Sequence, residues 1–366
     1  MSVTLRIVAG VGAAAALLGA WVTMRHRRLL GDELHGPPGF HVTTFARVSG
    51  ARFMAVGPDG AVYVSEPELG QVVRLVDNGH GVADSVIVFA SGLDGPHGLA
   101  FHGGALYVAA YTGVVRVAGV AKTVLNHYSG GGAHQSRTIV FGGAPDSAMY
   151  VSIGSSCNLC VEKDSDRAVV MRYDTDGSHG RVFARGLRNA VGLAIAPGTG
   201  ALWATVNERD NIEPNHENLP PDRLDVITDG GDYGWPYCYG DHMANPEFHD
   251  SARCQREIPP VLGFQAHSAP LGLAFVRGAT TFPASYQGDI LVAFHGSWNR
   301  RIPTGDKVVR VRLEGGKPVG YDDFITGWQR NNGSRWGRPV DVIVARDGSV
   351  LVSDDLAGTI YRVTGN

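Results

Sequence analysis

Histidine and arginine side chains recur in this chain directly before apolar segments that are typical of β-strands. The set comprises His97, His134, Arg188, His267 and Arg338, with Asn189 directly after Arg188. Histidine changes protonation near neutral pH and can act as a general base, whereas the guanidinium fork of arginine matches carboxylates and phosphates bidentately. A single loop histidine is more often structural than catalytic. Because several histidines and arginines recur at one structural position, a functional role is as good an interpretation here as a structural one. The arginines favour an anionic ligand.

The segment Ala133–Gly154, AHQSRTIVFGGAPDSAMYVSIG, shows how such residues would be placed. It contains an apolar strand, a Gly/Pro/Asp turn and a second strand, a pattern that predicts a β-hairpin. His134, Gln135, Ser136 and Arg137 stand just before the first strand, where a loop would lead into a sheet. His134 is therefore the candidate general base.

Composition limits the classes of protein to consider. The chain has 50 Gly and 19 Pro in 366 residues and only 18% charged residues, which favours many short strands joined by tight turns. A net charge of -3 and a pI near 6.5 give no electrostatic signature of nucleic-acid binding. The sequence also contains no P-loop and no Rossmann fingerprint that would hold a nucleotide.

Internal repetition predicts the elements that position these side chains. One strand pattern occurs six times, as AVYVSE from Ala61, ALYVAA from Ala105, AMYVSI from Ala148, ALWATV from Ala201, DILVAF from Asp289 and SVLVSD from Ser349. Each copy follows another apolar strand, whose last core residues are Val56, Phe101, Phe141, Ile195, Phe275 and Val344. Each copy precedes a third strand, beginning at Gln71, Gly113, Ala168, Asp222, Lys307 and Thr359.

Repeats of roughly 40 to 50 residues with several strands each are typical of β-propeller blades. The sequence therefore predicts an all-β, six-bladed β-propeller, with insertions in the longer fourth and fifth intervals. The strand Phe40–Ala46 precedes the first full unit and is expected to close the last blade as its outer strand. An open pair of β-sandwiches is the alternative, which six matched triplets disfavour.

A propeller brings two kinds of loop to one face. The loop leading into the innermost strand, here called the approach loop, opens on the same face as the exit loop that leaves the second strand. The approach loops carry the histidines and arginines named above. The exit loops contribute Tyr111, the segment 155–160, the segment 207–210 and the segment 295–301. Loops on one face of a rigid scaffold are where chemistry is usually located.

The N-terminal segment is separate from these repeats. Residues 7–23 form an uncharged apolar run, so residues 1–28 are predicted to be a signal peptide or a membrane anchor, residues 29–38 a linker and residues 39–366 the propeller. Arg25, Arg27 and Arg28 follow the run. Under the positive-inside rule these charges would keep the domain in the cytoplasm.

The four cysteines point to the opposite side of the membrane. Cys157 and Cys160 form a C-x-x-C in a Gly/Ser-containing loop, and Cys238 and Cys254 bracket a polar loop, so two disulfides are expected. A zinc site would need both pairs to converge, and the second pair lacks the usual close spacing. A redox C-x-x-C is the other alternative, whereas Val161 after Cys160 excludes c-type haem attachment. The disulfides outweigh the flanking charges and predict an extracytoplasmic domain, periplasmic or on the outer face of the membrane.

Several of these segments together resemble a known family. AHQSRTIVFGG, GLRNAVGLAIAP, DGGDYGWP, HSAPLGLAF and FHGSWNR are similar to the sorbosone dehydrogenase branch of the pyrroloquinoline-quinone (PQQ) sugar dehydrogenases, which include the soluble quinoprotein glucose dehydrogenases. The resemblance extends from Phe40 to Val363. It implies a six-bladed propeller with PQQ and a Ca²⁺ ion on the open face, in agreement with the repeat count.

The resemblance implies a role for individual residues. His134 matches the general base that takes a proton from the sugar hydroxyl while hydride passes to the cofactor, and Arg188 matches the arginine beside the reacting carbonyl, where its charge stabilises the developing oxyanion. The cofactor-binding residues implied are Asn189, Arg338, His295 and either Arg300 or Arg301. Backbone carbonyls of Asn207, Glu208 and Arg209 fall where the family holds calcium, a cation that prefers oxygen ligands.

The chain also departs from the family pattern. Ala133 stands where the family often has Asp, Pro96 where it has a Gln, Glu208-Arg209 where it has Gly-Pro, and Val340 where it has a second cofactor-binding arginine. These changes match the sorbosone branch better than the glucose branch.

The function predicted is a PQQ-dependent dehydrogenase that oxidises an aldose, a sugar aldehyde or a related alcohol and passes electrons to a membrane quinone or a cytochrome. The first alternative is a calcium-dependent lactonase-type propeller, which would hold its metal with carboxylates and Asn side chains on the channel axis. The second is a non-enzymatic propeller that binds a partner without a cofactor.

Overall fold

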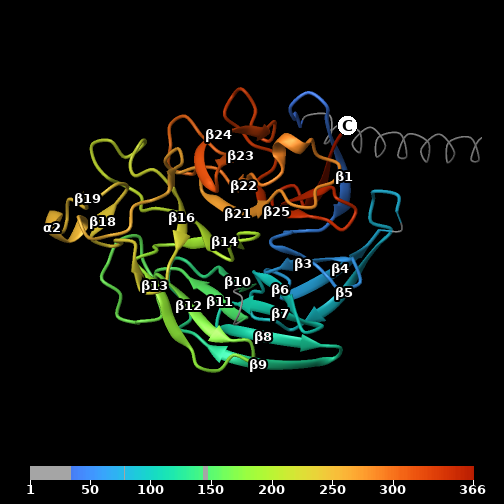
Figure 1. Ribbon diagram of the computed structural model, residues 1–366, viewed down its shortest axis with the longest axis horizontal. Coiled ribbons are helices and arrows are strands. Elements are labelled where there is room, and N and C mark those ends of the chain that lie inside the picture. Colours follow the sequence, from blue (N-terminus) through green and yellow to red (C-terminus); the bar gives the residue numbers. More distant parts are fainter. Residues whose placement is uncertain (1–33, 78, 143–146) are drawn as a thin grey trace, which may run out of the picture.

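The computed structural model describes residues 34–366 except residue 78 and residues 143–146. Six sheets are arranged radially about a central axis, and the chain passes from blade to blade in sequence order (Figure 1). Consecutive strands within each blade pair antiparallel. The six-bladed β-propeller predicted from the repeats is confirmed.

The first three blades begin with the strands that lie nearest the axis. Blade 1 contains β2 (Met54–Val56), β3 (Val62–Glu66), β4 (Gln71–Val76) and β5 (Ser85–Ser91). Blade 2 contains β6 (Leu99–His102), β7 (Ala105–Ala110), β8 (Gly113–Ala118) and β9 (Ala121–His127). Blade 3 contains β10 (Arg137–Gly142), β11 (Ala148–Ile153), β12 (Val169–Asp174) and β13 (Arg181–Arg185), and β17 (Gly231–Asp232) is added parallel to β13.

The other three blades follow the same order. Blade 4 contains β14 (Ala190–Ile195), β15 (Leu202–Val206), β16 (Arg223–Ile227) and β20 (Leu262–Gly263). Blade 5 contains β21 (Pro270–Phe275), β22 (Ile290–Phe294), β23 (Lys307–Glu314) and β24 (Lys317–Ile325), with the 3-10 helix η1 (Ala284–Tyr286) before β22. Blade 6 contains β25 (Pro339–Val344), β26 (Val350–Asp354) and β27 (Thr359–Gly365).

The N-terminal strand closes the ring. Strand β1 (Phe40–Arg47) is the outer strand of blade 6 and pairs antiparallel with β27, from Phe40 opposite Gly365 to Arg47 opposite Thr359. In Figure 1 the blue β1 lies beside the red C-terminal strands. Closure of this kind pairs strands that would otherwise leave exposed edges, and the predicted role of the Phe40–Ala46 segment is confirmed.

The burial of each strand follows its distance from the axis. The second strands β3, β7, β15, β22 and β26 are buried along their whole length, because a neighbouring blade covers each of their faces. Outer strands such as β9 are largely exposed. Around the axis, Phe53, Val191, Leu271 and Val340 from four different blades form one apolar cluster, which fixes the blades relative to one another beneath the open face.

The long fourth interval contains the expected insertion. Between β16 and β20 the chain forms the hairpin of β18 (Cys238–Tyr239) and β19 (Met243–Ala244), followed by the short helix α2 (Ser251–Cys254), which is capped by the Asp250 side chain. The disulfide Cys238–Cys254 joins this hairpin to the helix, with its Cα atoms 5.6 Å apart. The second disulfide, Cys157–Cys160, lies in the exit loop of blade 3. Both expected bridges are present.

The predicted linker requires a correction over its described part. Leu34 is buried in the core cluster that contains Phe282 and Phe324, and His35 exchanges two backbone hydrogen bonds with Thr326. Residues 34–38 therefore pack on the propeller, because an apolar side chain and backbone polar groups find partners there. The predicted signal or anchor segment 1–28 and the turn 143–146 lie outside the described residues. Within the described residues, no helix has the length and apolar character needed to cross a membrane.

Candidate active site

The approach and exit loops converge on one face, as the propeller topology requires. Their polar side chains form two groups joined by hydrogen bonds and ion pairs. The first, here called the arginine cluster, consists of Arg52, His97, His295, Arg338 and Asp355. The second, called the histidine–arginine pair, consists of His134 and Arg188 with their partners.

Asp355 holds the arginine cluster together. Its carboxylate lies 2.6 Å from Nη1 of Arg52 and 3.0 Å from Nε2 of His295. The Arg52 Nη2 group donates to Nε2 of His97 at 3.3 Å, while Nδ1 of His97 lies 3.0 Å from the Arg137 carbonyl. Arg338 donates from Nε and Nη2 to the carbonyls of His295 and Gly296 at 2.8 and 2.9 Å.

The charges in this cluster follow from burial. Burial lowers the pKa of His295 to about 4, with Arg52 and Arg338 adding to the effect, and burial also holds the pKa of His97 well below its usual value. Burial alone would raise the pKa of Asp355, but the His295 hydrogen bond and the Arg52 charge outweigh it and keep the pKa far below normal. At neutral pH the cluster thus holds two guanidinium cations, one carboxylate and two neutral imidazoles. It borders a cavity of about 440 Å³ whose lining includes Tyr111 and Ser136.

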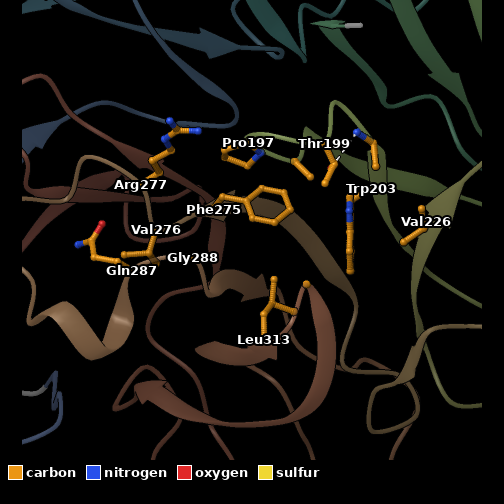
Figure 2. Close-up of a pocket in the computed structure, with 13 residues that line it drawn as sticks. Pro197, Thr199, Trp203, Val226, Phe275, Val276, Arg277, Gln287, Gly288 and Leu313 are labelled. Atoms are coloured by element: carbon orange, nitrogen blue, oxygen red, sulfur yellow. Dashed lines mark hydrogen bonds between the residues drawn. The ribbon is translucent and has the colours of Figure 1, made fainter. Parts of the chain in front are cut away.

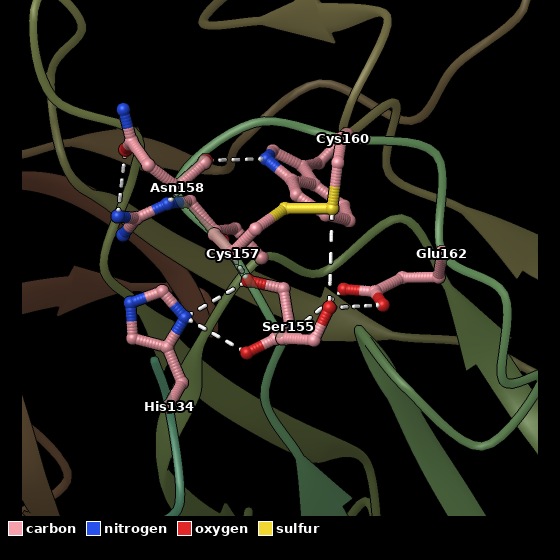
Figure 3. The surroundings of a disulfide bond; sticks show 9 residues. His134, Ser155, Cys157, Asn158, Cys160 and Glu162 are labelled. Carbon is pink, nitrogen blue, oxygen red and sulfur yellow. Dashed lines mark hydrogen bonds between the residues drawn. A yellow bond between two sulfur atoms is a disulfide. The ribbon is translucent and has the colours of Figure 1, made fainter. Parts of the chain in front are cut away.

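The hydrogen bonds of His134 define its tautomer. Nδ1 lies 2.8 Å from Oγ of Ser155 and 3.2 Å from the Ser155 carbonyl, which can only accept (Figure 3). The Ser155 hydroxyl donates its proton to the Cys157 carbonyl at 2.7 Å, so its oxygen is left to accept. The Nδ1 atom of His134 therefore carries the hydrogen, and the Nε2 lone pair is available.

The environment also sets the protonation state of His134. Burial lowers its pKa to about 4, and the positive charge of Arg188 adds to this effect. The ring is therefore neutral at pH 7 and can accept a proton at Nε2. The pKa of His134 thus lies below the ordinary range of histidine, first because the ring is buried and second because the Arg188 guanidinium is close by.

Arg188 is held in place by the loops around it. Its side chain is 5% exposed and donates to the Asn158 carbonyl and side chain at 3.0 and 2.9 Å. Asp210 lies 3.3 Å from Nη2 and also contacts His267, with 3.4 Å between Oδ1 and Nδ1. Burial alone would lower the pKa of His267, but the hydrogen bond with Asp210 outweighs burial and raises it. Two of the predicted approach-loop residues, Arg188 and His267, thus contact the Asp210 carboxylate, and a third, His134, lies near Arg188.

The structure does not support the proposed calcium site. Nη1 of Arg188 donates to the carbonyls of Asn207 and Glu208 at 3.2 and 2.6 Å, so these oxygens already bind a cation, whose charge would repel Ca²⁺. Arg209 is buried and directs its side chain to Glu247 at 2.6 Å. Asn207 Oδ1 and Glu208 Oε2 are buried without a hydrogen-bond partner, but the Glu208 carboxylate lies 3.6 Å from an Arg223 nitrogen. The backbone-carbonyl arrangement therefore does not fit Ca²⁺.

Two further cofactor-binding candidates lie away from the arginine cluster. Arg300 donates to the carbonyls of Glu217, Ala266 and Ile302, and Arg301 is exposed and lies 3.8 Å from Glu217. Both side chains thus contact Glu217, in the segment between β15 and β16. Asn189, by contrast, is buried with its Oδ1 atom unpartnered and lies close enough to His134 for both to border Gly154.

Arg52 and Asp355 were not predicted as site residues, although the repeat could have identified both of them. Arg52 precedes β2 as His97 precedes β6, and Asp355 follows β26 as Tyr111 follows β7. Arg52 supplies a second guanidinium beside Arg338 in the lining of the same cavity. In this chain Val340 stands at the position of the second cofactor-binding arginine that the resemblance implies. Asn158 lies within the exit-loop segment 155–160 that the repeat placed on this face, but its contact with Arg188 depends on the conformation of that loop.

A larger cavity lies on the opposite side of blades 4 and 5. It has a volume of about 660 Å³ and is lined mainly by apolar residues, including Trp203, Phe275 and Leu313 (Figure 2). Its walls come from the turns that follow the innermost strands, so it opens away from His134. Arg277 is the charged residue in its lining, and the cavity does not contain the groups that acid–base chemistry needs.

Two curated proteins are similar in sequence to part of this chain. A Coprinopsis cinerea pyrroloquinoline quinone-dependent pyranose dehydrogenase is 26% identical over 293 residues, covering 63% of this chain and 39% of that protein. A Borreliella burgdorferi protein described as uncharacterized is 34% identical over 219 residues, covering 59% of this chain and 56% of that protein. The chain thus spans well under two thirds of the length of the curated relatives it matches.

Solved structures show the same fold. The iodide structure of the Trichoderma reesei carbohydrate-active enzyme of family AA12 has a TM-score of 0.79 at 22% identity, covering 91% of this chain and 98% of that chain. The resemblance to the quinoprotein sugar dehydrogenases that the motifs indicated is confirmed. The TrAA12-like family model matches residues 35–366, nearly the entire chain, and the protein belongs to that family.

Proposed function

We propose that this protein is a PQQ-dependent sugar dehydrogenase that oxidises an aldose, a sugar aldehyde such as sorbosone, or a related alcohol. The observation that carries the proposal is the state of His134, a neutral imidazole with its Nδ1 hydrogen fixed on Ser155 and its Nε2 lone pair available beside a buried arginine. The names of the matched pyranose and sugar dehydrogenases support the same reaction class.

The residues present fit an anionic, planar cofactor. PQQ carries carboxylates, and the guanidinium groups of Arg52 and Arg338 border one cavity on the open face. Nη2 of Arg52 donates to His97, and two nitrogens of Arg338 donate to backbone carbonyls. These hydrogen bonds hold both guanidinium groups in place without a ligand. Asn189 adds a buried, unpartnered Oδ1 atom near His134. Arg52, Arg338 and Asn189 are therefore the residues assigned to hold PQQ.

When bound, PQQ supplies the carbonyl group that accepts hydride from the sugar. His134 receives the hydroxyl proton at Nε2, and the Ser155 contacts keep its ring in the tautomer that allows this. Arg188 places a fixed positive charge beside the reacting centre, where it stabilises developing negative charge. Trp298, 75% exposed in the exit loop of blade 5, offers an apolar surface for a sugar ring on the same face.

The cellular setting is part of the proposal. Two disulfides are typical of proteins in oxidising compartments, which supports a periplasmic location or one on the outer face of the membrane. Residues 1–28 would then direct export or anchor the domain, and electrons would pass to a membrane quinone or a cytochrome. The lactonase alternative requires a group of carboxylates on the axis. Within the described part of the chain, the one cluster of three metal-ligating side chains is Cys157, Cys160 and Glu162, whose sulfurs are joined in a disulfide.

The test is reconstitution of the purified cofactor-free protein with PQQ, with and without added calcium, followed by sugar-dependent reduction of an artificial dye. Saturable PQQ binding with turnover on an aldose or a sugar aldehyde is the expected result. Tight binding without turnover on any sugar would indicate a binding role, and absence of PQQ binding would refute the proposal.

A further inference from the structure

The C-x-x-C loop of blade 3 makes contact with both proposed reacting residues. Ser155, two residues before Cys157, receives the Nδ1 hydrogen of His134, and its own hydroxyl donates to the Cys157 carbonyl at 2.7 Å. The backbone amide of Ser155 also donates to the Arg188 carbonyl at 2.7 Å. The start of this loop therefore links the two residues to each other.

Asn158, enclosed between the two cysteines, uses nearly all of its hydrogen-bonding capacity at the site. Its backbone carbonyl accepts from Nε of Arg188 at 3.0 Å and from the indole of Trp235 at 3.3 Å. Its side-chain oxygen accepts from Nη2 of Arg188 and from the backbone amide of Asp210, both at 2.9 Å. Its side-chain amide donates to the Asp210 carbonyl at 3.2 Å. Figure 3 shows Asn158 beside the disulfide between Cys157 and Cys160, so the loop that this bridge closes carries the partners of Arg188.

The two disulfides of the protein differ in accessibility. Cys157 and Cys160 are half-buried, whereas Cys238 and Cys254 are 0% exposed. Thiol–disulfide exchange requires access of the attacking thiolate to a sulfur atom, so a reductant should open the blade 3 bridge first. The buried bridge then provides an internal control in the same molecule.

We propose that the Cys157–Cys160 loop is a positioning element for the dehydrogenase reaction: it orients His134 through Ser155 and Arg188 through Asn158, and opening this one disulfide lowers turnover without unfolding the propeller. The predicted loss of turnover rests on the proposed function. The predicted change in the geometry of His134 and Arg188 does not. Displacement of a reacting group by about 1 Å lowers a rate by on the order of 100-fold, so roughly a 10- to 100-fold loss is expected.

The first experiment uses selective reduction of the full-length wild-type protein. Mass mapping after alkylation should find label on Cys157 and Cys160 and none on Cys238 and Cys254, with an unchanged circular dichroism spectrum. In the cofactor-free protein labelled with ¹⁵N-histidine, the His134 ring, assigned with His134→Gln, should lose its single Nδ1-H tautomer. Its pKa should rise toward the ordinary value as the ring leaves its buried position next to Arg188.

The second experiment uses variants with a matched control. Asn158→Ala removes the side-chain acceptor for Arg188 and Asp210 and should lower kcat about tenfold or more, with little change in PQQ affinity. Asn158→Asp keeps acceptor oxygens and should restore much of the loss. The control is Asn126→Ala. Asn126 is a half-buried residue of β9, the outer strand of blade 2, and its side chain donates to the Gly177 carbonyl of blade 3, so its removal should leave kcat unchanged.

The outcomes separate this proposal from the proposed function. A protein with two alkylated thiols that retains the His134 tautomer, pKa and kcat would overturn the positioning role, as would an Asn158→Ala variant that behaves like Asn126→Ala. If the oxidised protein turns over no sugar, the proposed function fails. The tautomer and pKa measured on the oxidised and reduced cofactor-free protein then decide the positioning role by themselves.

Discussion

Replacing His134 with alanine tests the proposed mechanism most directly. At pH 7 a histidine with a pKa of about 4 is protonated in roughly one molecule in a thousand, so the wild-type enzyme has its base fully available. General base catalysis contributes about 100- to 10,000-fold, and each factor of ten corresponds to about 1.4 kcal/mol of barrier. His134→Ala should therefore lower kcat by about two to four orders of magnitude.

The same substitution should have little effect on folding or on PQQ binding. The described polar contacts of the ring are those with Ser155, and loss of a typical hydrogen bond costs about 1 kcal/mol of stability. The assay is sugar-dependent dye reduction at saturating PQQ, combined with a separate PQQ titration and thermal unfolding. His127→Ala, at the exposed end of β9, is the matched control. Near-normal turnover of His134→Ala in a protein that binds PQQ would refute the assignment and move the search to His97 or His267.

The protonation state of His134 also predicts the pH profile. The value of kcat/KM should rise with pH through about 4 and remain level above it, because only the neutral ring accepts a proton. The measurement is of initial rates across the acid range, and a rise near pH 6.5 would contradict the prediction. Arg338→Ala should weaken PQQ binding well over tenfold, since an unpaired cofactor carboxylate costs roughly 2 to 5 kcal/mol, and equilibrium titration should show this while kcat at saturating PQQ changes little. Arg188→Ala should lower both kcat and the melting temperature, because its guanidinium satisfies the carbonyls of Asn158 and Glu208; an unchanged melting temperature in calorimetry would contradict these contacts. Removal of residues 1–28 should leave a folded domain, since β1, which starts at Phe40, closes the ring against β27, and loss of the β-sheet circular dichroism signal would show otherwise.

The sequence predicted the blades because their signals are local. Each strand and turn is indicated by residues that are neighbours in sequence: apolar runs for the strands and Gly-rich segments for the turns. The unit of three strands is then recognised because it recurs six times. The ring closure by β1 was predicted for the same reason, because one unpaired strand precedes the first unit and a propeller has one place for it. The two disulfides followed from an even cysteine count and from pairs that bracket loops.

The sequence located the face of the site but not its internal contacts. Position in the repeat identified His134, Arg188 and Arg338, and it would have identified Arg52 and Asp355 if applied to the first and last blades. The family resemblance, by contrast, led to the expectation of calcium on carbonyls that accept hydrogen bonds from Arg188. Arg188, the donor that faces those carbonyls, is itself held by Asn158 from the exit loop of blade 3, a contact between loops that are distant in sequence.

The amino-acid sequence by itself thus determined the fold class, the ring closure and the face on which the polar loops gather. These features follow from strand periodicity and turn chemistry. The tertiary structure alone decided the partner of each polar side chain. Arg52 meets Asp355 across 303 residues, and Arg188 meets Asn158 across 30, through loops whose conformations are fixed by the blades beneath them. Protonation states depend on those partners and on burial, so the neutral, oriented state of His134 could be derived only after the chain had closed around it.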